Sequence, residues 1–483
     1  MFRFGGDWNE YDPSDGSFDC NGVIAADRSL HPHAYEVRYQ YRNILTSYAG
    51  NGNIKVYNEN FFKDLSQYYI SWILEEDGIA VANGTVQNIN AGPQQTVTIN
   101  LGLPKINTDK DLYLTVRYIL KAQDGLQNAG DEVAYDQMAI NESTSPAFAA
   151  GSAAIAGTEV TYVHEGDLNT FSGLFNFPGC ETYRAAGWVA VFNQKSGALE
   201  SYKINGAEML KEPLLPQFGR AVNENDMGAR LNERYKVWLY PEFKVKNFTV
   251  KKVEAGYSVV TEYEPIADGA AAVTVAYSIL PDGSISGTES MKDAGNLSKA
   301  PDLFRFGMQF TMPGKYSVVD FYGKGPWENY CDRNSAALVG RYVQSVNDQY
   351  HYGYVRAQES GTHTELRYLR VLDGNGTGLE ISANTKFSGS VLPFSMKELD
   401  CTLNGTPHRA NKTNGQNGAA LHSLSLKKLS HENDRMNGKT CVNFELMQMG
   451  VGGINSWGTL PLEPYRIHAA EREFHFVIRP VDN

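Results

Sequence analysis

A glycine-rich segment near the C-terminal end of the sequence carries one tryptophan. Residues 450–458 read GVGGINSWG, and their glycines allow tight turns that would display Trp457 from a loop. An aromatic face displayed in this way suits stacking against the CH groups of a sugar ring. A packing role stays open as well, because a loop tryptophan often plugs the edge of a core. The segment is therefore a candidate sugar contact with a structural alternative.

Charged side chains gather in two further segments. Residues 327–333 read WENYCDR, and residues 356–359 read RAQE. Carboxylate and guanidinium groups at this density can line a polar cleft, or they can pair with one another inside a core. Their residue types favour a buried network of ion pairs, and the cleft wall remains the alternative.

A histidine pair near the N-terminus has the residue types of a metal site. His31, Pro32 and His33 are followed by Glu36. Because Pro32 holds the pair extended, we expect the two rings to diverge. Packing or loop capping is therefore favoured over a metal cluster.

Three common catalytic patterns are absent in any strong form. A glycosidase needs two carboxylates about 5–10 Å apart, a phosphoryl-transfer enzyme needs a glycine-rich phosphate loop, and a serine hydrolase needs a nucleophile elbow. The glycines of residues 323–325 do not open a helix, because Pro326 and Trp327 follow them. No catalytic residue is assigned from the sequence.

The charge and cysteine content narrow the range of functions. The 483 residues include 43 Lys or Arg and 55 Asp or Glu, for a formal net charge of −12, which disfavours nucleic-acid and anionic-membrane partners. No apolar run approaches the roughly 18 residues of a membrane span. The five cysteines lack CxxC spacing, so neither a zinc knuckle nor a disulfide framework is indicated. No signal pattern is present, and the compartment, cytoplasm or periplasm, stays unassigned.

Short strands must position these residues, because their pattern dominates the chain after a loop-rich beginning. Residues 112–120, LYLTVRYIL, alternate between an apolar face and a face carrying Thr115 and Arg117. Strands at this spacing over residues 43–145 predict an immunoglobulin-like β-sandwich. The fold class is therefore predicted to be all-β.

A change in composition predicts a domain boundary. Residues 143–158, STSPAFAAGSAAIAGT, are small and have few aromatics, which is typical of a linker. Residues 146–483 continue with strand and turn patterns and predict one large antiparallel domain. Within it, residues 404–438 are rich in Asn, Gly and Lys and are expected to form a long exposed excursion.

Five motifs follow one another in a fixed order: GGDWNEYDPSDGSFDCNGVIAADRSLHPHAYEV, FGRAVNENDMG, YGKGPWENYCDR, YVRAQESGTHTELRYL and QMGVGGINSWG. Together they resemble the C-terminal half of the large bacterial β-galactosidases of glycoside hydrolase family 2, essentially from end to end. The resemblance implies a remnant of the C-terminal end of a (β/α)8 barrel at residues 1–42. It further implies an immunoglobulin-like sandwich at 43–145 and a galactose-mutarotase-like antiparallel supersandwich of the small-chain type at 146–483.

The same resemblance implies roles for four residues. Asn21 matches a contact for galactose and for a bound Na⁺, and Phe18 matches the residue whose backbone carbonyl binds that ion. Trp457 matches an aromatic platform for the aglycone, and Gly228 matches the glycine that opens a mobile active-site loop. Several positions depart from the family motifs and bear on the aglycone preference: Val222, Cys331 and Leu30 for prolines, Trp327 for a histidine, and Ile454 with Asn455 for an acidic pair.

The function implied is that of the C-terminal portion of a retaining β-galactosidase that hydrolyses terminal β-D-galactosides. Its catalytic carboxylates would lie on the barrel upstream, so the chain alone is expected to be inactive. Na⁺ and Mg²⁺ are implied for the full enzyme, with neither fully bound by this chain alone. The expected partners are a galactoside shared with the barrel region and further copies in a homo-oligomer.

Two other functions stay open. The chain could be a non-catalytic small subunit or a carbohydrate-binding module that complements a separate catalytic chain. A mutarotase-like activity would need a Glu base and a His acid converging on one ring, and no such pair is recognisable in the sequence. A start at Met1 within a loop favours an excised piece over a natural subunit.

Overall fold

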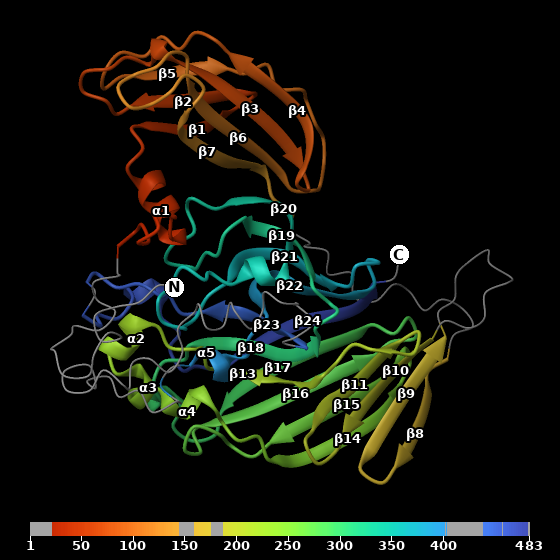
Figure 1. Cartoon of the computed structure of the whole chain (residues 1–483). Coiled ribbons are helices and arrows are strands. Elements are labelled where there is room, and N and C mark those ends of the chain that lie inside the picture. Colours follow the sequence, from red (N-terminus) through yellow and green to blue (C-terminus); the bar gives the residue numbers. More distant parts are fainter. Residues whose placement is uncertain are drawn as a thin grey trace, which may run out of the picture.

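Strands account for most of the regular structure. The computed structural model describes residues 22–143, 159–174, 187–400, 402, 438–455 and 457–481, and within them the strands form immunoglobulin-like sheets and one large curled antiparallel sheet (Figure 1). The predicted all-β fold class is confirmed.

The N-terminal unit consists of two antiparallel sheets around a common core. One sheet has the order β1 (Ile44–Gly50), β2 (Asn53–Asn58), β5 (Thr96–Asn100), and the other has the order β4 (Ile79–Val86), β3 (Tyr68–Glu76), β6 (Leu112–Leu120), β7 (Glu132–Asn141). Ile54 and Val56 of the first sheet and Ile70 and Leu114 of the second are fully buried in one apolar cluster. The alternation read from residues 112–120 therefore gives β6 its core face.

The second unit is a sheet that closes on itself. Its strands are β8 (Thr161–Glu165), β9 (Leu168–Leu174), β10 (Gly187–Asn193), β11 (Ala198–Ile204), β12 (Ala207–Glu208), β13 (Glu212–Gln217), β14 (Val245–Val253), β15 (Gly256–Tyr263), β16 (Ala271–Ile279), β17 (Ile285–Asp293), β18 (Arg305–Pro313), β19 (Val318–Gly325), β20 (Leu338–Ser345), β21 (His363–Leu372), β22 (Gly378–Leu392), β23 (Lys439–Gln448) and β24 (Arg472–Val481). Every strand pairing in the sheet is antiparallel, as the strand and turn patterns of the sequence predict.

One hairpin shows how the sequence builds this sheet. In β16 every second residue from Ala271 to Ile279 is buried and the residues between them are half-buried. The chain turns at residues 281–283, where Gly283 adopts a φ of +82°, and Ile279 then pairs with Ile285 of β17. A Pro-Asp-Gly turn and a two-residue apolar period are thus sufficient to place both strands.

Helices are short and lie at the end of the curled sheet that faces the N-terminal segment. They are α1 (Pro32–Gln40), α2 (Glu224–Gly228), α3 (Leu231–Arg234), α4 (Lys236–Leu239) and α5 (Met396–Leu399). Among the described residues, no helix has both the length and the apolar character needed to cross a membrane.

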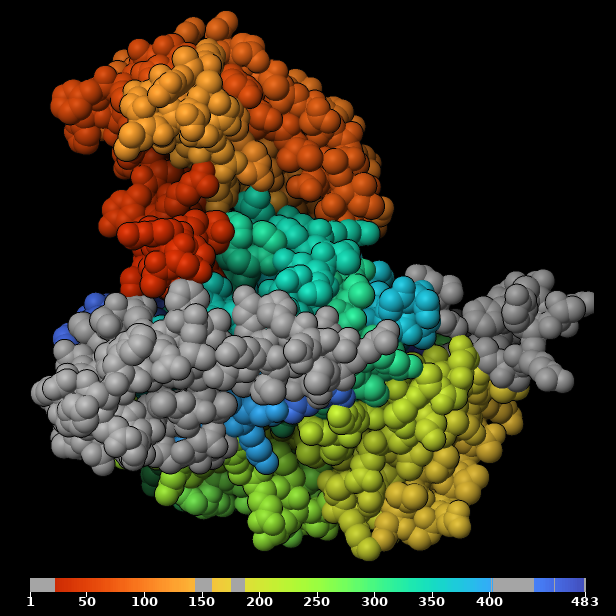
Figure 2. Space-filling view, viewed as in Figure 1, coloured from red at the N-terminus to blue at the C-terminus, as the bar shows by residue number. Residues whose placement is uncertain are grey.

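The immunoglobulin-like unit rests on strands β19–β21 of the curled sheet, and α1 lies beside this junction (Figures 1 and 2). A buried ion pair joins the two units, because Arg367 Nε donates to Asp111 Oδ2 at 2.7 Å. The Tyr135 hydroxyl donates to the carbonyl of Ala336 at 2.7 Å. These contacts fix the immunoglobulin-like unit relative to the large sheet.

Three predicted regions fall wholly or largely outside the described residues. They are residues 1–21 of the expected barrel remnant, residues 144–158 of the expected linker, and nearly all of the expected excursion at 404–438. The predicted domain boundaries therefore stay predictions.

Candidate functional site

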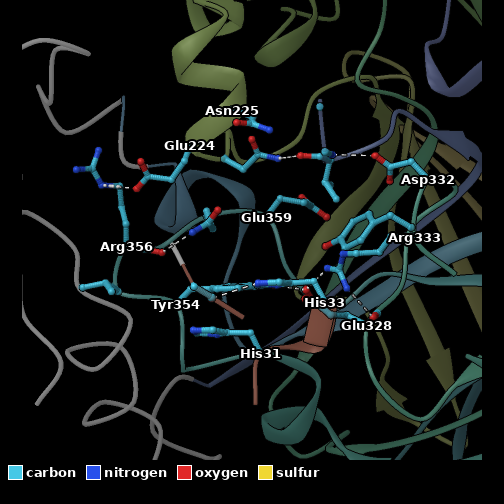
Figure 3. A pocket seen from close by; sticks show the side chains of 18 of the residues that line it. His31, His33, Glu224, Asn225, Glu328, Asp332, Arg333, Tyr354, Arg356 and Glu359 are labelled. Carbon is cyan, nitrogen blue, oxygen red and sulfur yellow. Dashed lines mark hydrogen bonds and ion pairs between the residues drawn. The ribbon is translucent and has the colours of Figure 1, made fainter. Parts of the chain in front are cut away.

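A polar cavity of about 470 Å³ lies where five segments of the chain meet (Figure 3). The segments are Gly22 with His31 and His33, residues 223–225 at the start of α2, residues 328–333 after β19, residues 354–359 before β21, and residues 451–455 after β23. Both charged segments singled out in the sequence therefore contribute to one cavity wall.

A buried arginine holds the start of α2 in place. Arg220 is fully buried and donates from Nε and Nη2 to the carboxylate of Asp226 at 3.1 and 2.8 Å. Asp226 also forms a capping box with Asn223, in which each side chain accepts a hydrogen bond from the other residue's backbone N–H. The cap and the ion pair together fix the start of the short helix that ends at Gly228.

The same arginine ties α2 to the glycine-rich loop. Arg220 donates to the carbonyls of Met449 and Gly450 at 2.5 and 3.0 Å, and Asn223 Nδ2 donates to the carbonyl of Val451 at 3.1 Å. From the other side, the N–H of Gly452 donates to Asp332 Oδ2 at 2.8 Å. Residues 449–452 are thus held from two directions.

The loop continues to Trp457, whose side chain is 73% exposed. Its backbone N–H donates to Asn455 Oδ1 at 2.9 Å. The next residue, Gly458, has a φ of +94°, and its backbone lies directly against Gly228. A Cβ on Gly228 would lie 3.0 Å from the carbonyl carbon of Trp457, so only a glycine fits at position 228 without movement.

Glu328 is the most strongly bound carboxylate of the cavity. It accepts hydrogen bonds from Arg333 Nη2 at 2.7 Å, from the hydroxyls of Tyr354 and Ser360 at 2.6 Å each, and from the N–H of Gly361 at 2.7 Å. Burial raises the pKa of Glu328, but Arg333 and the hydroxyl donors outweigh burial and lower it to about 2. Glu328 is therefore a fixed anion that forms a buried ion pair in the cavity wall.

The two histidines of the N-terminal pair do not diverge. The rings of His31 and His33 are parallel at 5° with centroids 5.4 Å apart, and His31 Nδ1 lies 2.8 Å from His351 Nε2. The expectation of divergent rings was wrong, because Pro32 is the first residue of α1 and places the two rings on either side of a helix start. Burial lowers the pKa of His33 and of His351 to about 4, so these rings are neutral at pH 7.

No metal cluster is formed by these side chains. Among the described residues, no group of three or more His, Cys, Asp or Glu side chains is placed to bind a metal ion. The packing interpretation of the histidine pair stays a prediction.

Four carboxylates face the cavity, and all of them contact protein groups: Glu224, Glu328, Asp332 and Glu359. Glu359 accepts from Arg305 Nη2 at 3.0 Å and from Gln448 Nε2 at 3.0 Å. A general acid must keep its proton near neutral pH, whereas Glu328 loses its proton at far lower pH. The cavity wall thus resembles a fixed polar surface more than a catalytic pair.

Tyr330 and Asp332 each place in this wall one polar atom that is buried without a hydrogen-bond partner among the described residues. These atoms are the hydroxyl of Tyr330 and Oδ1 of Asp332. Buried polar atoms are normally paired, so these two mark positions where water or another polar group completes the wall.

The structure brings together two of the four residues whose roles the family resemblance implies. Gly228 lies against the backbone of Trp457 and Gly458, and residues of the same two segments line the cavity, whereas Phe18 and Asn21 lie outside the described residues. Gly22, the residue after Asn21, lines the cavity.

Sequence reasoning missed the residues that organise the site. The Asn223 to Asp226 spacing is that of a capping box and could have located α2. No local signal marks Arg220, because its partners at 449 and 450 are distant in sequence.

Comparison with protein families gives two matches. A model described as "Beta galactosidase small chain" matches residues 184–478, and a model described as "Beta-galactosidase, domain 4" matches residues 54–141. The first match covers most of the curled sheet and the second most of the immunoglobulin-like unit.

Several curated proteins resemble the chain along nearly its whole length. A β-galactosidase of Halalkalibacterium halodurans is 28% identical over 99% of the chain, and one of Priestia megaterium is 27% identical over 96%. The chain spans 43% and 41% of the length of these two relatives. Among solved structures, a galactose 1-epimerase from Lactobacillus acidophilus NCFM matches 68% of the chain with 7% identity and a TM-score of 0.30.

Proposed function

The chain belongs to the β-galactosidase small-chain family, and from this premise we propose that it is the non-catalytic C-terminal part of a retaining family 2 β-galactosidase. In this proposal it supplies the wall and a loop of the substrate site for terminal β-D-galactosides. The nucleophile and the acid/base carboxylate come from a catalytic region outside this sequence.

The exposed position of Trp457 supports the proposal most directly. A tryptophan that plugged a core would be buried, whereas this side chain is 73% exposed on a loop whose base is fixed by Arg220. A rigid support lowers the entropy cost of presenting an aromatic ring to a ligand. Trp457 is therefore proposed as the platform for the aglycone.

The contact of Gly228 with Gly458 supports a role for α2 in the same site. Because the two backbones touch, a movement of the segment at Gly228 must be accompanied by a movement of the Trp457 loop. We propose that the mobile part is the chain that follows Gly228, beyond the start of α2 that Arg220 and Asp226 hold, and that it opens and closes over the aglycone during turnover.

The cations remain part of the proposal. Asn21 Oδ1 and the carbonyl of Phe18 are hard oxygen donors that suit Na⁺, but two donors leave the ion incompletely coordinated. The other Na⁺ ligands, and those of Mg²⁺, would come from the catalytic region. A homo-oligomer of the full enzyme is proposed on the same basis.

The experiment is a kinetic comparison in the enzyme that contains both regions. Trp457→Ala should raise KM for lactose with little change in kcat, because aglycone stacking is lost equally in the ground state and the transition state. Phe62→Ala is the matched control, since Phe62 is 95% exposed on the immunoglobulin-like unit. An unchanged KM in Trp457→Ala would remove the platform assignment.

The second candidate function is that of a natural small subunit. The description of the matching family model, "Beta galactosidase small chain", supports this candidate. The two candidates differ in whether the catalytic region is a separate chain. Co-purification of this chain with a separately expressed catalytic chain, with recovery of hydrolysis, would support the subunit.

A further inference from the structure

A second cavity, of about 330 Å³, lies at the junction of α1, the immunoglobulin-like unit and the curled sheet. It shares no lining residue with the polar cavity described above. Trp327 and Glu328 are adjacent in sequence, yet they line different cavities. The volume is within the range typical of small-molecule sites, and such sites are common where domains meet.

Aromatic rings form the walls of this junction cavity. Tyr35 of α1 stacks on Trp327 with ring centroids 3.9 Å apart at 13°. Tyr135 and Tyr342 contribute further rings. Gly325 allows the chain to pass close to Tyr342, since a Cβ at that position would lie 2.8 Å from the ring.

The polar ends of two of these rings are already engaged. The Tyr342 hydroxyl donates to the carbonyl of Leu338 at 2.9 Å, and the Tyr135 hydroxyl donates to the carbonyl of Ala336 at 2.7 Å. Away from Arg38, Arg117 and Glu132, the cavity therefore offers ring faces and the Leu338 side chain, with few free hydrogen-bonding groups. A sugar enclosed here would leave hydroxyls without partners, which is costly.

Charges of both signs surround the cavity and offset one another. Arg38 and Arg117 both bind the carboxylate of Glu132. Glu75 lies close enough to Arg117 to interact with it electrostatically. Glu36 lies close enough to Tyr135 to act on its hydroxyl in the same way. Two guanidinium groups face three carboxylates, so the net charge around the cavity is small. It therefore does not favour an ionic ligand of either sign.

We propose that the junction cavity binds an uncharged aromatic molecule of one or two fused rings. The volume of about 330 Å³ suits a ligand of this size. The aromatic ring of the ligand lies among the side chains of Tyr35, Trp327, Tyr135 and Tyr342. A single hydroxyl or N–H group of the ligand reaches the edge of the cavity, which is formed by Arg38, Glu132 and Arg117. This inference does not depend on the proposed function, because it uses neither the polar cavity nor Trp457.

The test uses indole as the probe, with benzoate and methyl β-D-galactopyranoside as the charged and the polar comparison. Ligand-detected saturation-transfer NMR followed by titration should give a Kd of about 0.1–5 mM for indole. Benzoate and the galactoside should bind more weakly. Equal or tighter binding of the galactoside, or no indole binding at 5 mM, would overturn the proposal.

Two variants locate the binding. Leu338→Trp fills the cavity and should abolish indole binding, and Trp327→His removes part of one wall and should weaken binding about two- to tenfold. Trp457→Ala and Phe62→Ala remove exposed aromatics elsewhere and should leave binding unchanged. Thermal melting checks that each variant is folded, and if Leu338→Trp does not fold, Trp327→His decides. Indole affinity that is unchanged in the folded cavity variants would overturn the proposal.

Discussion

The backbones of Gly228 and Gly458 lie in direct contact, and this contact couples α2 to the loop that presents Trp457. A Cβ placed on Gly228 would be 2.8 Å from both the nitrogen and the Cα of Gly458. Gly458 also has a positive φ that side chains other than glycine rarely adopt. Two glycines from opposite ends of the large domain thus allow two loops to touch.

Gly228→Ala tests this contact. The added methyl group must push the Trp457 loop away, so we expect a loss of about 1–3 kcal/mol in the free energy of unfolding. In the enzyme containing both regions, KM for lactose should also change. Gly374→Ala is the control, because nothing lies within 4 Å of a Cβ there. Equal stability of both variants in urea unfolding would show that the contact is not tight.

Arg220 is predicted to be the main support of the site. Arg220→Met leaves Asp226 and the carbonyls of Met449 and Gly450 without their donor, and we expect a loss of about 3–5 kcal/mol. Arg230→Met is the matched control, since its pair with Glu233 is exposed and should contribute about 0–1 kcal/mol. Urea unfolding curves of the two variants measure the difference. Similar small losses in both would contradict the role given to Arg220.

Stability should fall in mild acid because of two half-buried histidines that are neutral in the folded chain. Burial lowers the pKa of His33 and of His351 to about 4, against about 6.5 in the unfolded chain. Between these values the unfolded chain binds protons that the folded chain does not, so stability decreases as the pH falls from 6.5 to 4. The two rings together should cost about 3–5 kcal/mol by pH 4.

Unfolding measurements between pH 7.5 and 4.5 check this window. His351→Gln should reduce the slope, whereas His164→Gln, at an exposed position on β8, should leave it unchanged. A flat stability profile in the unmodified chain would mean that the histidines are not buried in this way.

His468 is predicted to have the opposite effect on the pH dependence of stability, because its protonated form stabilises the folded chain. Its ring contacts Asp302 at 2.8 Å through Nδ1 and Glu463 at 2.5 Å through Nε2, and the hydrogen bond to Asp302 contributes most to raising its pKa. A raised pKa means that its contribution is present below pH 6.5 and is lost as the pH rises through the folded-state value. An NMR titration should place this pKa above 6.5, and Glu463→Gln should lower it. A value at or below 6.5 would contradict the bridging geometry.

Much of the fold was predictable because strand periodicity is a local signal. In β16 buried and half-buried residues alternate, in β6 every second residue from Leu112 to Leu120 is apolar and buried, and the turn at residues 281–283 has the residue types of a hairpin. The closure of the large sheet was not predictable in the same way. Pairings such as β17 with β24 join residues nearly 190 positions apart, for example Thr288 with His475, and no local pattern encodes them.

The candidate site was predictable only in part. The glycine-rich segment made Trp457 a candidate and the family resemblance implied a role for Gly228, but their contact arises from the closed sheet. Trp327 shows where prediction from the sequence fails. Its position in a family motif suggested an effect on the aglycone preference. The structure places it instead against Tyr35 in the junction cavity. The orientation of a side chain that follows a strand depends on its packing partners, and these partners cannot be identified from the local sequence.

A hydrolysis assay tests the central claim, that this chain shapes a galactoside site without supplying its catalytic carboxylates. The purified chain is compared with the enzyme containing both regions, using a chromogenic β-galactoside with Na⁺ and Mg²⁺ present. We predict no hydrolysis above background by the chain alone and full hydrolysis by the enzyme with both regions. Turnover by the chain alone that is lost on changing Glu224, Glu328, Asp332 or Glu359 to the amide would contradict the account and place the catalytic carboxylates in the cavity itself.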